Sequence, residues 1–368
     1  MGSLVVIGRW FVLTLAGLSA VAWFASLRLG RRRGPAAAIP VGVAAVLLTV
    51  ATGADLVNAH YGYLPRVNDV IGRTTWPTTS LRELTAPTST RTPSSASRRS
   101  SVSHRTGAVA TLPIPGRVSG FGTHGAMVYL PPQYFTDPTR RFPVVYLLHG
   151  SPGAPIDWYR ANRAAQTGSG LASSGQPAIL VAPQVSRTWF DDSECVDRPH
   201  ERIETYVVDD VIPTIDIRLR TLTDRDDRIF AGMSAGGFCA LNLGLRHRGL
   251  VGAIVDMSGF DRPTHTGGMT GLFGHGVDLD RVLAGNTPVQ YAPTLPSQPP
   301  LKVWLDCGRG DHSALADQRA MARILTGRGA DVVLHLRPGG HDYNVWRPAL
   351  RDGLGWSVPA TNIHIPTS

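Results

Sequence analysis

Lysine is almost absent from this chain of 368 residues: Lys302 is the only one, so nearly all of the 36 basic side chains are arginines. The formal net charge of +9 at pH 7 is spread along the sequence. It comes without zinc-finger spacing, a basic helix or an aromatic ladder, the features that accompany contact with DNA or RNA. The composition therefore argues against a nucleic-acid partner, while a hydrophobic content of 43% provides for a sizeable core.

Cysteine is scarce as well. Cys195, Cys239 and Cys307 are the only three, and three cysteines cannot all pair with one another, which excludes a disulfide framework. The count allows one bridge in an oxidising compartment. Cys239 falls in an expected helix and Cys307 at an expected strand end, so we predict that both are small buried hydrophobes rather than redox groups.

Two long apolar runs open the sequence. The first, at about residues 5–27, is interrupted only by Arg9, and the second, at about 35–56, contains Pro40. About 20 apolar residues suffice to cross a bilayer, so we expect two transmembrane helices. The strongly apolar part of the second run is shorter, which leaves open whether that run spans the membrane or is cleaved.

The arginines between these runs, at 28 and 31–33, predict the orientation in the membrane. By the positive-inside rule this loop faces the cytoplasm, and everything after about residue 56 lies on the extracytoplasmic side of the cell membrane. The alternative is a signal sequence cut near 51–54 with the arginine tract as its charged n-region, but the first apolar run would then have no explanation.

Residues 57–106 are expected to connect the membrane region to a globular domain. Tyr61 and Tyr63 suit the membrane interface. From about 86 to 107 the sequence consists mainly of Ser, Thr, Pro and Arg, with too little apolar surface to form a core, as is typical of a linker. We therefore place the globular domain at residues 107–368.

Beyond the linker, β-like and helix-like segments alternate, which is typical of a mostly parallel sheet covered by helices. The expected strands are 126–130, 144–148, 178–181, 228–231, 252–255, 301–305 and 331–336, and helix-like runs lie at 204–218, 237–247 and 314–326. Ligands bind such sheets at the carboxyl ends of the strands. Residues at those ends are therefore the candidates for chemistry.

The strand at 228–231 leads into Gly232-Met-Ser-Ala-Gly236 and then into a helix-like run. This pattern predicts a nucleophile elbow, in which a sharp strand-to-helix turn lifts Ser234 above the sheet. The glycines two residues before and after the serine keep side chains out of the crossing. The same turn aims the backbone amide of Ala235 at the reaction centre, as half of an oxyanion hole.

An acid and a base follow in the order that an α/β-hydrolase requires. The loop after the strand at 301–305 offers two carboxylates, Asp306 and Asp311. Asp311 lies further past the strand and is better placed to reach a histidine, whereas Asp306 would anchor the loop through backbone amides. His341 follows the strand at 331–336, after two glycines, and is the candidate general base.

The oxyanion hole needs a second amide, which this fold takes from the loop after an early strand. Here that loop is His149-Gly-Ser-Pro-Gly153. The amide of Ser151 is the natural donor, because Pro152 has no N–H.

Four segments together carry a family resemblance: Leu147-Leu-His-Gly150, the elbow, the acid loop from Asp306 to Asp311, and Gly340-His-Asp-Tyr-Asn-Val-Trp346. Over roughly residues 107–355 the chain resembles the esterase D group of α/β-hydrolases, which includes feruloyl esterases and the antigen 85 mycolyltransferases. The resemblance implies an α/β-hydrolase fold and acyl transfer through an acyl-enzyme.

The substrate is less well defined. The mycolyltransferases carry Asp-Gly-Leu at the oxyanion loop and a glutamate as the acid, whereas this chain has His149-Gly-Ser151 and Asp311, closer to the plain esterases. A Gly- and Pro-rich excursion at 261–300 is expected to shape the acyl pocket. Three hypotheses stand: an esterase acting on carboxylic esters, a cell-envelope acyltransferase using acyl lipids, and an inactive envelope protein that uses the hydrolase shell for binding.

The mechanism predicted from the sequence is attack by Ser234 on an ester carbonyl. His341 acts as general base, Asp311 orients it, and the amides of Ser151 and Ala235 hold the oxyanion. No metal or organic cofactor is implied.

Overall fold

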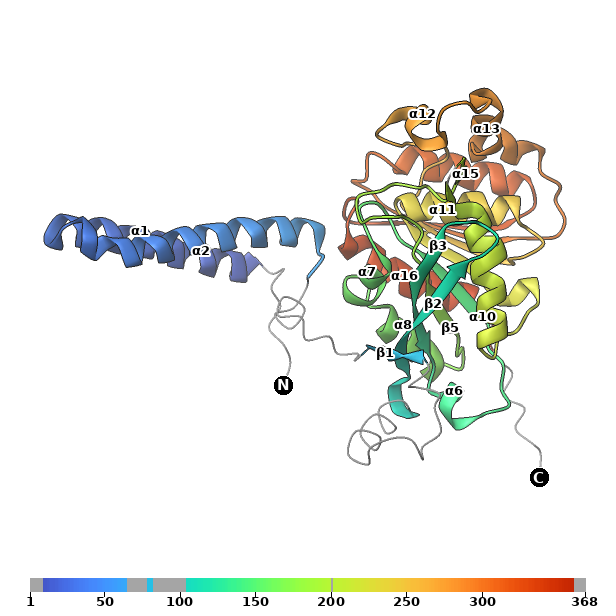
Figure 1. The fold of residues 1–368 in the computed structure, drawn as a ribbon, viewed down its shortest axis with the longest axis horizontal. Coiled ribbons are helices and arrows are strands. Elements are labelled where there is room, and N and C mark those ends of the chain that lie inside the picture. The colour runs from blue at the N-terminus through green and yellow to red at the C-terminus, as the bar shows by residue number, and fades with distance from the viewer. Residues whose placement is uncertain (1–8, 65–77, 82–103, 200, 361–368) are drawn as a thin grey trace. The chain divides into compact units, whose positions relative to one another are not determined.

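The computed structural model describes residues 9–64, 78–81, 104–199 and 201–360. They fall into two compact units, one with the two amino-terminal helices and one with the sheet. Most of the expected linker lies outside the described residues. Figure 1 shows the helices and strands of each unit.

The amino-terminal unit is a pair of helices, α1 (Arg9–Arg33) and α2 (Pro35–Tyr61). By length and composition both could cross a membrane, with mean hydropathies of 1.8 and 2.0. The prediction that the arginines at 28 and 31–33 form a loop between the two helices is wrong, because α1 continues through Arg33. Arginine is a good helix former, and Gly34, at φ 88°, makes the turn alone before a proline that suits the first helical position. The second helix also extends past the predicted end at 56.

In the second unit, the described residues form a nine-stranded sheet in the order β1-β2-β3-β5-β4-β8-β9-β10-β11. The strands are β1 (Thr78–Ser80), β2 (Ala108–Gly116), β3 (Gly122–Leu130), β4 (Val144–Leu148), β5 (Ile179–Ala182), β8 (Arg228–Met233), β9 (Ala253–Met257), β10 (Lys302–Gly308) and β11 (Asp331–Arg337). Only β3 pairs with its neighbours in antiparallel fashion, and the other pairings are parallel. The mostly parallel sheet is confirmed, and all seven expected strands are present. The short strands β6 (Asp197–Arg198) and β7 (Glu201–Arg202) form a separate hairpin.

Helices cover both faces of this sheet (Figure 1). On one face, α10 (Ile212–Arg218), α11 (Ala235–Arg246) and α15 (Leu315–Gly327) bury apolar side chains against alternate strand residues. On the other face lie α7 (Pro155–Arg160), α8 (Ala164–Ser173) and α16 (Tyr343–Ser357). Gly168 of α8 lies against Tyr129 and Leu180, and Gly353 of α16 lies against Val255 and Trp304.

The expected helix at 204–218 is interrupted. It consists of α9 (Ile203–Thr205), a π-helical segment (Tyr206–Val211) and α10. Pro213, at the start of α10, has no N–H to donate to the preceding turn, and a wider π turn accommodates such a break.

The excursion at 261–300 is helical in part, with α12 (Gly268–Phe273), α13 (Leu279–Gly285) and α14 (Pro288–Tyr291). Elsewhere α6 (Gln133–Thr136) follows β3. Figure 1 shows α12 and α13 close together at the top of the unit.

A disulfide joins Cys195, in the loop after β5, to Cys239 in α11, with the two Cα atoms 5.4 Å apart. The one bridge that the cysteine count allowed is therefore present, and Cys239 is bonded rather than the small buried hydrophobe that we predicted. Cys307 is free and buried as expected. Pairing depends on which segments the fold brings together, and three cysteines allow three different pairs.

We expect that replacing both bonded cysteines, as Cys195→Ser with Cys239→Ser, destabilises the sheet unit by about 2–4 kcal/mol. The bond closes a sequence separation of 44 residues, so its loss releases a long loop in the unfolded chain. Thermal unfolding of the full chain in neutral detergent measures the effect, and reductant should lower the Tm of the wild type in the same way. Cys307→Ala is the control: it keeps the disulfide, so reductant should still lower its Tm. An unchanged Tm in the double variant would contradict the prediction.

Candidate active site

Ser234 lies between β8 and α11 in strained backbone geometry, with φ 56° and ψ −126°. A positive φ is rare for a residue other than glycine and costs free energy. The surrounding hydrogen bonds hold it: Ser234 N–H donates to Met257 O at 2.9 Å, and Gly237 N–H donates to Ser234 O at 2.8 Å. The turn has the sharp strand-to-helix geometry that the sequence predicts for a nucleophile elbow.

The glycines of the elbow are required by close approach. A Cβ on Gly232 would lie 1.7 Å from the carbonyl oxygen of Gly236, and a Cβ on Gly236 would lie 2.0 Å from that of Leu148. Any side chain at either position would push helix α11 away from the strands. The serine is thereby fixed against the sheet.

Three predicted site residues meet at the carboxyl ends of β8, β10 and β11. Nε2 of His341 lies 2.7 Å from Oγ of Ser234, and Nδ1 of the same ring lies 2.8 Å from Oδ2 of Asp311. With Nδ1 donating to the carboxylate, Nε2 is an acceptor for the serine hydroxyl. This arrangement can remove a proton from the serine and stabilise the imidazolium that results.

Asp311 is buried but stays ionised. Burial opposes its charge, but the hydrogen bond and positive charge of His341, together with the hydroxyl of Ser313 at 2.6 Å, hold the pKa of Asp311 far below its usual range. The backbone N–H of Ala314 also donates to this carboxylate, at 3.2 Å. A fixed anion therefore faces the histidine at all moderately acidic and neutral pH values.

Asp306, the other candidate acid, points elsewhere. It is fully buried, and Arg337 on β11 donates to both of its oxygens at 2.8–2.9 Å. Trp304 Nε1 donates at 3.2 Å. Burial is the largest influence and raises the pKa of Asp306 despite these donors. The sequence suggested that Asp306 anchors its loop through backbone amides. In the structure it anchors the strand ends through Arg337 instead. Arg337 itself gave only a weak signal, a basic residue closing an apolar strand.

Two aromatic rings position the imidazole of His341. Phe260 stacks nearly parallel to it with the centroids 6.1 Å apart, and Trp346 packs edge-on at 4.9 Å. The histidine side chain is about one-third exposed, so a substrate can reach it from solvent.

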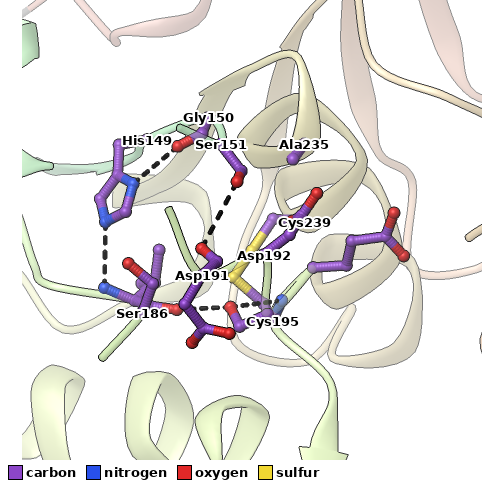
Figure 2. Close-up of a pocket in the computed structure, with 12 residues that line it drawn as sticks. His149, Gly150, Ser151, Ser186, Asp191, Asp192, Cys195, Ala235 and Cys239 are labelled. Atoms are coloured by element: carbon purple, nitrogen blue, oxygen red, sulfur yellow. Dashed lines mark hydrogen bonds between the residues drawn. A yellow bond between two sulfur atoms is a disulfide. The ribbon is translucent and has the colours of Figure 1, made fainter. Parts of the chain in front are cut away.

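The loop expected to supply the second oxyanion amide lies directly beside the serine. A Cβ on Gly150 would be 3.3 Å from Cβ of Ser234. Val185 N–H donates to Nε2 of His149 at 3.2 Å, so Nδ1 of that ring carries the proton and donates to Gly150 O at 2.9 Å. Burial lowers the pKa of His149, which keeps the ring neutral in this bridging role. Figure 2 shows Ser151 and Ala235 near each other on the wall of one small cavity.

The rest of that cavity was not foreseen from the sequence. Asp191, Asp192 and Glu194 from the loop after β5 line it, and the Cys195–Cys239 bond forms part of its wall (Figure 2). Glu194 accepts two hydrogen bonds from Thr264 at the start of the excursion, yet burial raises the pKa of Glu194 to about 7. The acidic run in the sequence was a signal, but only the fold brings it beside the elbow, where Cys195 is bonded to Cys239.

The acid and base loops are packed together through Gly308 at the end of β10. A Cβ there would lie 2.5 Å from the carbonyl oxygens of both Gly339 and Gly340. We expect Gly308→Ala to displace the loop that carries His341 and to lower kcat for a simple ester by about tenfold to a hundredfold, with a smaller effect on KM. Gly327→Ala, at the end of α15 where a Cβ meets nothing within 4 Å, is the matched control. A raised KM with unchanged kcat would contradict this role.

The strand order, the elbow and the order of serine, acid and histidine define an α/β-hydrolase. Residues 122–357 match the family described as "Putative esterase", and the chain belongs to this family of carboxylic ester hydrolases. The resemblance to the esterase D group is thus confirmed at the level of the family.

Two relatives show how far the similarity extends. The chain is 26% identical over 261 residues to an uncharacterized protein of Corynebacterium glutamicum, covering 68% of this chain and 61% of that one. It is 28% identical over 251 residues to an esterase of Mycobacterium tuberculosis, covering 61% of this chain and 53% of that one. The chain therefore spans only about half to three-fifths of the length of these relatives.

Solved structures share the fold. A ferulic acid esterase superposes with a TM-score of 0.60 at 24% identity, over 69% of this chain and 98% of that one. A fluorophosphonate-binding serine hydrolase of Staphylococcus aureus superposes with a TM-score of 0.57 at 18% identity, over 69% and 99% of the two chains.

Proposed function

We propose that this chain is a serine esterase that cleaves carboxylic esters through an acyl-enzyme on Ser234. The observation that carries the proposal is His341, whose two ring nitrogens lie 2.7 Å from the serine hydroxyl and 2.8 Å from the Asp311 carboxylate. Membership of an esterase family supports the same chemistry.

In the first step, Oγ of Ser234 attacks the ester carbonyl while Nε2 of His341 takes its proton. Asp311 stabilises the imidazolium and keeps the ring in the correct tautomer. The carbonyl oxygen becomes an oxyanion that the amides of Ser151 and Ala235 stabilise. The proton then passes from His341 to the leaving alcohol, and the acyl group remains on the serine.

In the second step, a water molecule takes the place of the alcohol. His341 removes its proton, the hydroxide attacks the acyl carbon, and Ser234 leaves with the proton returned to it. The exposed third of the imidazole side chain leaves a path for this water molecule, so the acyl-enzyme can be hydrolysed.

A fluorophosphonate probe tests this proposal, because it reacts only with an activated serine. The full chain in neutral detergent should be labelled, and mass spectrometry of the digest should place the adduct on Ser234. Hydrolysis of p-nitrophenyl acetate, with and without a sugar as competing acceptor, should release free acid in both cases. An adduct on another residue would contradict the assignment, and acylated sugar would indicate a transferase.

We further propose that α1 and α2 anchor the enzyme in the cell membrane with the esterase unit outside the cytoplasm. The length and apolarity of the helices and the arginines at the end of α1 support this orientation. Alkaline phosphatase, which is active only outside the cytoplasm, can be fused after residue 64. Activity of the fusion supports the proposal, and an inactive fusion with a cytoplasmic reporter active at the same position would contradict it.

A further inference from the structure

Residues 257–260, at the end of β9 and in the turn after it, contact several parts of the reaction centre. The first of them accepts a hydrogen bond at its carbonyl oxygen from Ser234 N–H at 2.9 Å. The second donates its N–H to the carbonyl oxygen of Asp306 at 2.8 Å, on the strand before the acid loop. The last, Phe260, stacks on the imidazole of His341. A shift of this segment would therefore disturb the serine and the histidine together.

The carboxyl group of Asp256, on β9, holds this segment from within the fold. Asp256 is fully buried, and its Oδ1 accepts from Gly259 N–H at 2.7 Å. Its Oδ2 accepts from Nε2 of Gln318 at 2.8 Å, and the same nitrogen donates to the carbonyl oxygen of Gly259 at 2.9 Å. The two side chains thus bind the N–H and the carbonyl of one residue in the turn, and we call them the Asp256–Gln318 clamp.

Gln318 connects this clamp to the acid loop. It lies on α15, the helix that begins just after that loop, and it is buried. Gln318 N–H donates to the carbonyl oxygen of Ala314 at 2.9 Å, and Ala314 N–H donates to Oδ1 of Asp311 at 3.2 Å. The clamp therefore joins the helix that supports Asp311 to the segment that holds Ser234.

The packing around the clamp leaves little room for adjustment. A Cβ on Gly237, in the first turn of α11, would collide with Oδ1 of Asp256 and lie 2.9 Å from Cα of Gly259. A Cβ on Gly259 would lie 2.5 Å from the backbone of Gly237 and of Phe238. The carboxylate and the turn thus pack directly against the helix that begins after the nucleophile.

This buried carboxyl group opposes folding. Burial is the largest influence on Asp256 and raises its pKa to about 7, and the charge of Asp317 adds to the rise, although the hydrogen bonds from Gln318 and Gly259 lower the pKa. A raised pKa means that the ionised carboxylate is less favourable in the fold than in the unfolded chain. Oε1 of Gln318 is also buried, without a hydrogen-bond partner among the described residues. Stability alone therefore does not explain this pair, whereas the position of the turn does.

We propose that Asp256 is a positioning residue of the esterase, which acts with Gln318 to hold residues 257–260 and thereby the spacing of Ser234 and His341. The inference rests on the proposed function, since it concerns the same reaction centre. A substrate does not reach Asp256, because this residue is fully buried. Loss of the clamp should therefore slow the chemical step and leave substrate binding unchanged.

Asp256→Asn and Gln318→Met test the clamp in the full chain in neutral detergent. The asparagine keeps the shape of the side chain but can accept only one of the two hydrogen bonds. We expect each variant to lower kcat for p-nitrophenyl acetate about tenfold to thirtyfold with KM nearly unchanged, because small displacements of reacting groups are costly. The double variant should lose little more than either single variant, because the two side chains act as one unit. The rate at which a fluorophosphonate labels Ser234 should fall in parallel.

Asp216→Asn is the matched control. Asp216 also accepts on both oxygens, from Thr221 at 2.7 Å and from Arg228 at 2.6 Å, but Arg228 begins β8 whereas Ser234 follows its other end. This control should lower the Tm and leave kcat unchanged, whereas Asp256→Asn should lower kcat with a Tm within a few degrees of the wild type. Values of kcat are referred to the sites that the probe titrates, so an unfolded fraction does not count.

Three results would overturn the positioning role: an unchanged kcat in Asp256→Asn or Gln318→Met, a raised KM at unchanged kcat, or losses that multiply in the double variant. In each case the probe would still label Ser234 of the wild type, and the proposed esterase would stand. A wild-type chain that the probe does not label at Ser234 would refute the esterase itself, and the positioning role with it.

Discussion

Ser234→Ala should lower kcat/KM for p-nitrophenyl acetate by roughly 10³–10⁶-fold while leaving the Tm within a few degrees of the wild type. The hydroxyl is the proposed nucleophile, and no other group at the elbow can form the acyl-enzyme. The residual rate would come from the oxyanion amides and from substrate binding. Kinetics of the full chain in detergent measure the effect, with Ser173→Ala on the exposed surface of α8 as the matched control.

The relation between serine and histidine gives a second readout of the same prediction. Residues that act as one unit lose activity together, so adding His341→Ala to Ser234→Ala should cost little beyond the first substitution. A further loss of the same size as that of His341→Ala alone would mean that the two side chains act independently. Activity retained in Ser234→Ala would remove the serine from the mechanism.

Much of this site could be predicted from the sequence because its determinants are local. The elbow requires two glycines at fixed distances from Ser234, and the approach distances of the structure explain why. Asp311 and His341 each follow a strand that is recognisable by its apolar run. In a parallel sheet, the carboxyl ends of the strands lie along one edge. The order of these residues along the chain was therefore enough to predict that three distant side chains lie close together.

Other features could not be predicted because they depend on tertiary pairing. Strand β2 contains Pro113 and Pro115, which argue against a strand from sequence alone, yet it lies near the sheet edge, where proline is tolerated. The Cys195–Cys239 bond joins segments that no local pattern relates. A groove between α8 and α16 likewise combines two helices that are far apart in the chain.

Asp311→Asn should lower kcat/KM by about 10³–10⁴-fold with little change in Tm. Oδ1 would keep its bonds to Ser313 and Ala314, so the amide nitrogen would replace the oxygen that faces His341. That nitrogen is a donor, and Nδ1 of the histidine would then have to accept. The ring proton would move to Nε2, which could no longer accept the proton of Ser234.

Asp306→Asn provides the contrast that decides between the two aspartates. Its loss leaves Arg337, whose side chain is only 12% exposed, with Asp352 as the remaining carboxylate partner. Breaking such a buried pair costs about 3 kcal/mol, which corresponds to a fall in Tm of roughly 6–10 °C for a domain of this size. The activity of the folded fraction should stay within about tenfold of the wild type, because Asp306 does not contact His341. The reverse pattern would be an Asp306→Asn variant that is stable but inactive and an Asp311→Asn variant that is active. Activity would then depend on the carboxylate bonded to Arg337 rather than on the one bonded to His341. That result would exchange the roles of the two aspartates.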